Sequence, residues 1–412
     1  MALAGTCRII PAVSFKVDQT LTSSPLWVSA FRPFYFLGAL YAPLLVTAWL
    51  GALFGFWHLP GDAVPLKLQH GHEFIFGFAV AIITGIVLTA LPSWAGTEEI
   101  CGGRLMLLVA LWLIGRIAFW TSAWLPAPLP AMADGLLYAA LLGMLTPQLL
   151  RVGNRLYLLL LPILLALFTA NLLYYHAVAN GNPLLAAQAL RLAIYAIIVL
   201  YVLKGGVLAP IFTGNALREK GRGGQAPFIM GLEAAGLAAL LLLAALDLAG
   251  AAPAWTGSAA LACALLYGWR SLRWQGWRVA DVPLLLTMHL GFAWLVFAFA
   301  LKAAAELTGW LPEAAWLHAF TVGSLGLMML GLMTRVSLRH TGRPLVVPRA
   351  MLFAYGALFL AALLRVVAGV GAPDTALIGL ATLLWAGAFV IYLLHFAPVL
   401  LAPSLPRAAK PE

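Results

Sequence analysis

The stretch from His318 to Arg343, HAFTVGSLGLMMLGLMTRVSLRHTGR, decides the fold. After His318 it carries no charge for about five helical turns, and it ends in a basic exit that contains His340. As a helix, the segment between these two histidines is about 33 Å long, and the hydrocarbon core of a bilayer is about 30 Å thick. The sequence therefore predicts a transmembrane helix with one imidazole near each surface. An intramembrane imidazole marks a functional site by default; the alternative is that both rings are ordinary interfacial side chains.

The composition of the whole chain indicates a membrane protein. Of its 412 residues, 63% are hydrophobic and only 9% are charged, and the mean hydropathy is +0.98. Soluble globular proteins carry about 25% charged residues. The apolar runs are long and unbroken, which predicts helices, because a transmembrane barrel would alternate apolar and polar residues. The predicted fold class is therefore all-α, a polytopic membrane helix bundle.

The apolar runs predict twelve spans, and an even number places both termini on one side of the membrane. Only five of the 24 Lys and Arg residues fall on the other side or in the outer halves of spans: Lys67, Arg116, Arg191, Lys302 and Arg365. By the positive-inside rule both termini are cytoplasmic. The expected spans are 31–54, 72–93, 104–125, 131–150, 156–178, 184–208, 227–249, 256–272, 283–303, 314–336, 350–370 and 375–398.

The expected domain organisation is a single transmembrane domain, 31–398, between a cytoplasmic N-terminal tail, 1–30, and a cytoplasmic C-terminal tail, 399–412. The connector 209–226 has the Gly, Asn and charges of an ordered or flexible cytoplasmic loop. The second and tenth spans resemble each other. HEFIFG from His72 and HAFTVG from His318 share Phe at the third position, Gly at the sixth and a further Gly at the fourteenth. This pattern indicates a parallel internal repeat, with chance as the rival explanation, since the chain has 39 glycines.

The histidines sort into two levels across the predicted bundle. His70, His72 and His318 fall at outer ends of spans, whereas His289 and His340 fall toward the inner ends. Two levels of imidazole suggest two sites. His70 and His72 are about 200° apart on a regular helix, so both face one ligand only if the helix begins near Gly71. Imidazole suits copper, iron and zinc alike, so the metal stays open.

Buried charges occupy the outer half of the predicted bundle. Arg116, Arg191 and Arg365 lie within spans, and Glu73 can neutralise one of them. The insertion cost of a central Arg is about 2.5–3.5 kcal/mol. The remaining arginines therefore need an anion such as a haem propionate or a bound substrate, unless they snorkel to the interface.

Several motifs make nearly the whole chain resemble the NnrS family, bacterial membrane proteins reported to carry haem and copper and tied to nitric oxide stress. The motifs are FRPF (31–34), HGHEFIFGF (70–78), LTALPSWAG (88–96), GGVLAPIFTGNAL (205–217), MHLGFAWL (288–295) and the 318–343 stretch quoted above. The resemblance implies a multi-pass protein of the bacterial inner membrane with b-type haem and copper. It binds or reduces nitric oxide in the manner of a nitric oxide reductase, takes electrons from an unidentified donor and has no nucleic-acid partner.

The resemblance also implies site residues. The family-matched imidazoles are the predicted metal ligands. We expect His72 and His318, completed by His70, at the outer metal site, and His289 with His340 at the inner one. Arg116, Arg191 and Arg365 are expected to bind haem propionates. Glu73, Arg116 and Arg191 are the candidate catalytic groups: the carboxyl to carry protons, because burial raises a carboxyl pKa, and the two arginines to orient an anionic intermediate.

Two other functions stay open from the residues alone. Twelve spans, a parallel repeat and intramembrane arginines also fit a transporter of a metal or small anion. Against it, no Gly- or Pro-broken pair of helices occupies matching positions in the two halves. A gas-binding sensor that signals through 209–226 is the third option, and the sequence shows no output domain attached to it.

Overall fold

A computed structural model describes residues 24–59, 64–370 and 374–406, and within these residues the regular structure is entirely helical. Short 3₁₀ turns lie at Pro25–Trp27, Ser122–Trp124 and Gly276–Val279. The long helical rods are, in order, α2 (Phe31–Leu53); α3 (Leu66–His72), η2 (Glu73–Ala79) and α4 (Val80–Ala95); α5 (Gly102–Trp120); α6 (Pro128–Arg151); η4 (Arg155–Leu159) and α7 (Leu160–Ala179); α8 (Pro183–Leu200), η5 (Tyr201–Gly205) and α9 (Gly206–Glu219); α10 (Met230–Leu248); α11 (Pro253–Arg273); α12 (Pro283–Thr308); α13 (Glu313–His318), η7 (Ala319–Leu325) and α14 (Gly326–His340); α15 (Arg349–Val367); and α16 (Thr375–Leu401).

The polytopic all-α bundle is confirmed, with a long helical rod at each of the twelve expected places. Eleven of the rods are both long and apolar enough to cross a membrane. The exception is α11, the expected span 256–272, which is 21 residues long but has Arg270 and Arg273 in its last turn. Its length suffices for a crossing, and these charges and small polar residues lower its hydropathy. It nevertheless packs between α10 and α12 like its neighbours.

Two local expectations were wrong. The connector 209–226 is helical as far as Glu219, because α9 continues the sixth rod beyond the predicted end of the span. The second rod begins at Leu66, several residues before Gly71, so His70 and His72 both lie on the regular helix α3. The break that would have let both rings face one ligand is therefore absent, and the two rings diverge.

The first and last rods meet at one end of the bundle. The Arg32 guanidinium, at the start of α2, donates to the carbonyl oxygens of Leu400 at 2.6 Å and Ala402 at 2.7 Å, where α16 ends. It also donates to Ser404 at 2.9 Å. The described chain thus enters and leaves the bundle on the same side, as the even number of rods requires. Most of the expected N-terminal tail and the end of the C-terminal tail lie outside the described residues.

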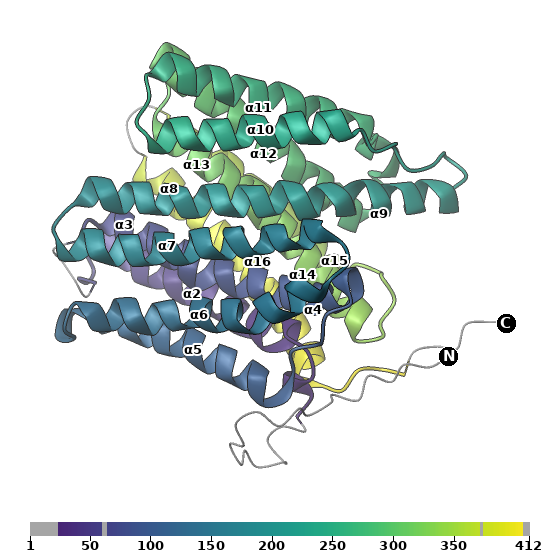
Figure 1. Ribbon diagram of the computed structural model, residues 1–412, viewed down its shortest axis with the longest axis horizontal. Coiled ribbons are helices and arrows are strands. Elements are labelled where there is room, and N and C mark those ends of the chain that lie inside the picture. The colour runs from purple at the N-terminus through teal and green to yellow at the C-terminus, as the bar shows by residue number, and fades with distance from the viewer. Residues whose placement is uncertain (1–23, 60–63, 371–373, 407–412) are drawn as a thin grey trace.

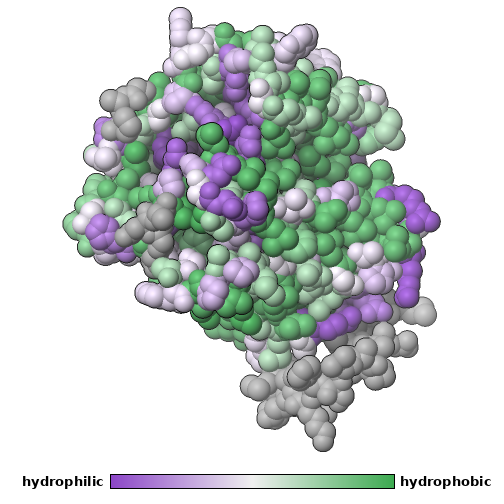
Figure 2. Space-filling view, turned by 60° about the vertical axis from the view of Figure 1, so that its left-hand side comes forward, coloured by the Kyte–Doolittle hydropathy of each residue, from purple (hydrophilic) through white to green (hydrophobic). Residues whose placement is uncertain are grey.

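Three rods form the centre of the bundle. In their most apolar windows, 78% of Glu313–His340, 72% of Leu66–Ala95 and 67% of Pro183–Glu219 are buried, against 22–56% for the other candidate spans. Figure 1 shows α5 and α6 at one edge and α10 and α11 at the opposite edge, with α8 and α9 running across between them. In Figure 2 apolar residues cover much of the surface and hydrophilic residues gather in separate regions beside it, as a membrane-embedded bundle requires.

The same three central rods are interrupted by π-helix. The segments η2, η5 and η7 widen the turn in the second, sixth and tenth rods. In two of them the seven-residue π segment begins directly after a histidine, at His72 and at His318. The sequence similarity between the second and tenth spans is therefore accompanied by a π-helical interruption at the same position after each histidine. Because π segments in helices are rare and frequently mark functional sites, this region is the first place to look for one.

Candidate functional site

His72 belongs to a buried cluster of charged side chains between α3, α5 and α6. Its Nδ1 lies 3.0 Å from Glu73 Oε1, and its Nε2 lies 3.5 Å from Asp134 Oδ2. The Arg116 guanidinium forms ion pairs with both carboxylates. None of the four side chains is more than 5% exposed. His72 Nδ1 thus contacts Glu73, whereas Nε2 lies near Asp134 but has no hydrogen-bond partner among the described residues.

Neutral side chains add hydrogen bonds to the two carboxylates of this cluster. Asn171 Nδ2 donates to Asp134 Oδ2 at 2.9 Å, and the Tyr175 hydroxyl donates to the same oxygen at 3.2 Å. Tyr41 donates to Glu73 and in turn accepts from Trp120 Nε1 at 2.7 Å. A buried ion pair is tolerable only when such extra bonds satisfy its remaining lone pairs. The cluster is therefore a built feature of the fold.

Part of this cluster was predictable from the sequence. Glu73 was expected to neutralise one intramembrane arginine, and the Glu73–Arg116 pair does so. Asp134 was not predicted, although it is the only acidic residue within the expected span 131–150. An intramembrane carboxylate is as costly as an arginine and carries the same functional signal. Reading acidic and basic residues together would have found it.

His70 and His318 form a second arrangement, on the opposite side of α3 from His72. His70 lies within electrostatic range of His318, and both lie within electrostatic range of the Arg365 guanidinium on α15. The His70 ring packs against Trp49 at 4.5 Å and Phe74 at 4.4 Å between ring centroids. The structure thus brings together two of the three outer histidines, each at the outer end of a central rod.

The hydrogen bonds of this arrangement leave imidazole nitrogens available to bind a ligand. His318 Nδ1 donates to the Ala314 carbonyl at 2.7 Å, which makes the opposite nitrogen, Nε2, the one with the free lone pair. His70 Nδ1 is buried with no hydrogen-bond partner among the described residues. Arg365 likewise makes no ion pair with any residue that the structure describes. Two imidazoles and one uncommitted guanidinium therefore converge in an aromatic-walled region.

Arg191 is engaged elsewhere. Its Nε lies 2.9 Å from Glu313 Oε1, and its Nη1 lies 3.9 Å from Asp247 Oδ1. Asp247 also accepts from Lys302 Nζ at 2.7 Å and from the Tyr195 hydroxyl at 2.8 Å. This is a second buried polar cluster, between α8, α10 and α12. Neither Asp247 nor its pairing with Lys302 was predicted from the sequence.

The two inner histidines contact different neighbours. His289 Nε2 lies 2.8 Å from Thr213 Oγ1, with Gly276 packed directly against the ring. The His340 ring lies 5.8 Å from the ring of Phe31, on the side of α14 that faces α2. Within the described residues, no group of three or more His, Cys, Asp or Glu side chains has an arrangement that could hold a metal ion. The inner pair of His289 and His340 therefore stays a prediction.

The model of the NnrS protein family matches residues 25–404, nearly the whole chain. A search of curated proteins found no match.

Proposed function

Because the chain belongs to the NnrS family, we propose that it is a haem- and copper-containing protein that binds or reduces nitric oxide and protects against nitrosative stress. We further propose that it lies in the inner membrane of a bacterium, with nitric oxide as its small-molecule ligand or substrate. The observation that supports the haem part is that two histidines at the outer ends of central rods, His70 and His318, both lie within electrostatic range of Arg365.

The residues around His70 fit a b-type haem. Haem iron takes imidazole axial ligands, and a ligating imidazole ordinarily donates its other N–H to a backbone carbonyl, as His318 does to Ala314. Trp49 and Phe74 supply aromatic surface for a flat ring. Arg365 supplies the cation that a propionate needs. Bound haem would supply the iron to which nitric oxide binds.

The cluster around His72 is suited to hold a proton near that region. Two ionised carboxylates and one guanidinium leave one negative charge, which a single proton shared by His72, Glu73 and Asp134 cancels. In a low-dielectric interior that cancellation is worth several kcal/mol. Reduction of nitric oxide to nitrous oxide consumes protons as well as electrons. The proposal assigns Glu73 and His72 the role of holding this proton, and it assigns Arg116 the role of positioning the carboxylates.

The described residues do not fit a copper site of three or more imidazole, thiolate or carboxylate ligands. Copper therefore rests on family membership alone, and no step is assigned to it. Arg191 is also left out of the proposed chemistry, because Glu313 already neutralises it.

A visible spectrum of the purified protein tests the proposal. We expect a Soret band that shifts with nitric oxide and is lost in His70→Ala and His318→Ala, while His176→Ala, at the exposed end of α7, keeps it. The absence of a Soret band in the unmodified protein, or full haem content in both variants, would contradict the haem assignment.

A second measurement separates binding from turnover. Nitrous oxide should form when a chemical reductant is supplied, and Glu73→Gln should slow it by about tenfold or more while the Soret band stays, since general acid–base groups contribute about 10²–10⁴-fold. A shifted Soret band without nitrous oxide would identify a nitric oxide-binding protein or sensor.

One structural observation favours a transporter as the second candidate. Interrupted central helices are typical of carriers, and η2 after His72 and η7 after His318 are two such interruptions, although the second and tenth rods are not equivalent positions in two six-rod halves. Uptake of copper or a small anion into liposomes by haem-free protein would support this function. No uptake together with a nitric oxide-sensitive Soret band would exclude it.

A further inference from the structure

A cavity lies on the inner side of the central rods, away from both polar clusters. Residues from α4, from α8 with η5, and from η7 with α14 line an open groove between the helices. Its walls are apolar, with Ile83, Ile86 and Val87 on one side and Leu325, Met328 and Met329 on the other. Small-molecule sites have mostly apolar walls. The lining thus suits an apolar ligand.

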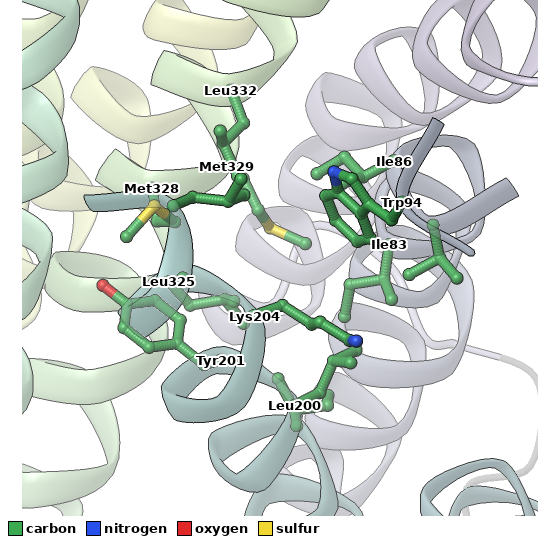
Figure 3. Close-up of a pocket in the computed structure, with 14 residues that line it drawn as sticks. Ile83, Ile86, Trp94, Leu200, Tyr201, Lys204, Leu325, Met328, Met329 and Leu332 are labelled. Carbon is green, nitrogen blue, oxygen red and sulfur yellow. The ribbon is translucent and has the colours of Figure 1, made fainter. Parts of the chain in front are cut away.

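One cation reaches into this apolar surrounding. In Figure 3 the Lys204 side chain extends from the ribbon of η5 across the cavity toward Ile83 and the side that carries Trp94. Its ammonium lies 4.0 Å from the ring centroid of Tyr157 and 5.6 Å from that of Trp94. It makes no ion pair or hydrogen bond with another described residue. Its charge is therefore open to an anion.

The neighbours of Lys204 fix its depth in the membrane. Trp94 is the last residue but one of the second rod, and Tyr157 lies in η4, where the fifth rod begins. Both positions are at the end of the bundle to which the positive-inside rule assigns the basic loops. Trp and Tyr are enriched at the level of lipid headgroups. The ammonium thus lies at headgroup level on the inner side, and the apolar cavity lies beside it.

We propose that this cavity binds a phospholipid with an anionic headgroup, whose phosphate pairs with Lys204 and whose acyl chain fills the space between α4 and α14. The charge and the apolar volume call for a ligand that is anionic at one end and apolar along its length. The inner leaflet supplies such molecules at this depth. The π segment η5 places Lys204 here, which gives the third interrupted rod a role separate from the two that follow histidines.

Lipid binding to detergent-purified, delipidated protein tests this site. By native mass spectrometry we expect phosphatidylglycerol to bind more tightly than phosphatidylcholine of the same acyl chains. Lys204→Met should weaken phosphatidylglycerol binding by about tenfold, the effect of losing one charge contact of about 1.4 kcal/mol. Lys220→Met is the matched control, because Lys220 pairs with Asp281 in an exposed connector, and it should leave binding unchanged.

A second variant tests the apolar part. Val87→Trp fills the cavity and leaves Lys204 intact, so it should also weaken phosphatidylglycerol binding. Equal affinity for both lipids, or unchanged binding in Lys204→Met and Val87→Trp, would overturn the proposal. Loss of haem from Lys204→Met would also overturn it, because the cavity would then belong to the cofactor. An unchanged Soret band in that variant keeps this test separate from the haem assignment.

Discussion

His70 and His72 are separated by one residue, yet their rings face different parts of the bundle. His70 lies against Trp49 of α2, whereas His72 stacks on Phe119 of α5 at 4.8 Å with an interplanar angle of 4°. Helical geometry turns neighbouring positions away from each other, so a pair two residues apart diverges. The two histidines consequently have different surroundings: His70 lies among aromatic rings, and His72 lies beside the carboxylates of Glu73 and Asp134.

Removing one ion-pair partner of Arg116 tests how much the charged cluster stabilises the fold. Asp134→Ala leaves part of the guanidinium unpaired in the membrane interior, and breaking a buried pair costs about 3–5 kcal/mol. We expect a marked drop in the thermal unfolding midpoint in detergent. Glu98→Ala removes a carboxylate from an exposed pair with Arg104 and should change the midpoint little. Equal effects of the two substitutions would contradict the structural role of Asp134.

The exposed pair between Lys220 and Asp281 predicts a pH-dependent contact. The hydrogen bond from Lys220, followed by the charges of Lys220 and Arg222, lowers the pKa of the Asp281 carboxyl. A lowered folded-state pKa means that the contact stabilises the connector at neutral pH and is lost as pH falls through that value, below about pH 4. Hydrogen exchange in the 220–229 connector should therefore quicken, relative to its intrinsic rate, on acidification.

Asp281→Asn supplies the control for the connector. This variant lacks the charge at every pH, so its protection should be low at neutral pH and should not change on acidification. A connector that stays equally protected in both proteins would show that the pair contributes nothing.

The π segments are held by side chains from other helices. Widening the turn leaves carbonyl oxygens poorly aligned within the helix. Trp112 Nε1 donates to the Gly77 carbonyl in η2 at 2.9 Å, and Arg270 Nη1 donates to the Val202 carbonyl in η5 at 3.1 Å. Donors on α5 and α11 thus stabilise the interruptions, which ties the central rods to the peripheral ones.

Close packing at η7 gives a prediction at the scale of an element. A Cβ at Gly323 would lie 2.5 Å from Trp294 Cδ2, so Gly323→Ala forces α12 and η7 apart. We expect lower thermal stability and partial loss of the His318-dependent Soret band. Gly356→Ala on α15 meets no atom within 4 Å and should be neutral or stabilising by up to about 1 kcal/mol. A stable Gly323→Ala protein with an unchanged spectrum would argue against tight packing at η7.

The bundle as a whole is arranged around three buried rods, with the remaining helices in contact with lipid. Large apolar side chains on the outer rods, such as Ile117 and Leu265, are 62% and 65% exposed. In water such exposure would be costly, at roughly 25 cal/mol per Å² of apolar surface. The arrangement therefore presupposes a membrane, with the polar clusters buried between helices.

The orientation of the bundle can be checked with two exposed connector residues. Val346, between α14 and α15, and Trp310, between α12 and α13, are 71% and 87% exposed. In right-side-out vesicles, a membrane-impermeant thiol reagent should label Trp310→Cys and spare Val346→Cys, with the unmodified chain as the control for its native cysteines. The reverse labelling would invert the topology derived from the Lys and Arg distribution.

The sequence by itself determined the class of the fold, the number of long helices and the common side of their ends, because these depend on hydropathy, length and loop charge. It also singled out the outer histidines and the pairing of Glu73 with one of three intramembrane arginines, since intramembrane polar groups are few; the structure identified that arginine as Arg116. Only the tertiary structure decided that His70 meets His318 while His72 joins Asp134. The reason is that partners on different helices are set by packing angles and by π interruptions, and neither leaves a local signal in the sequence.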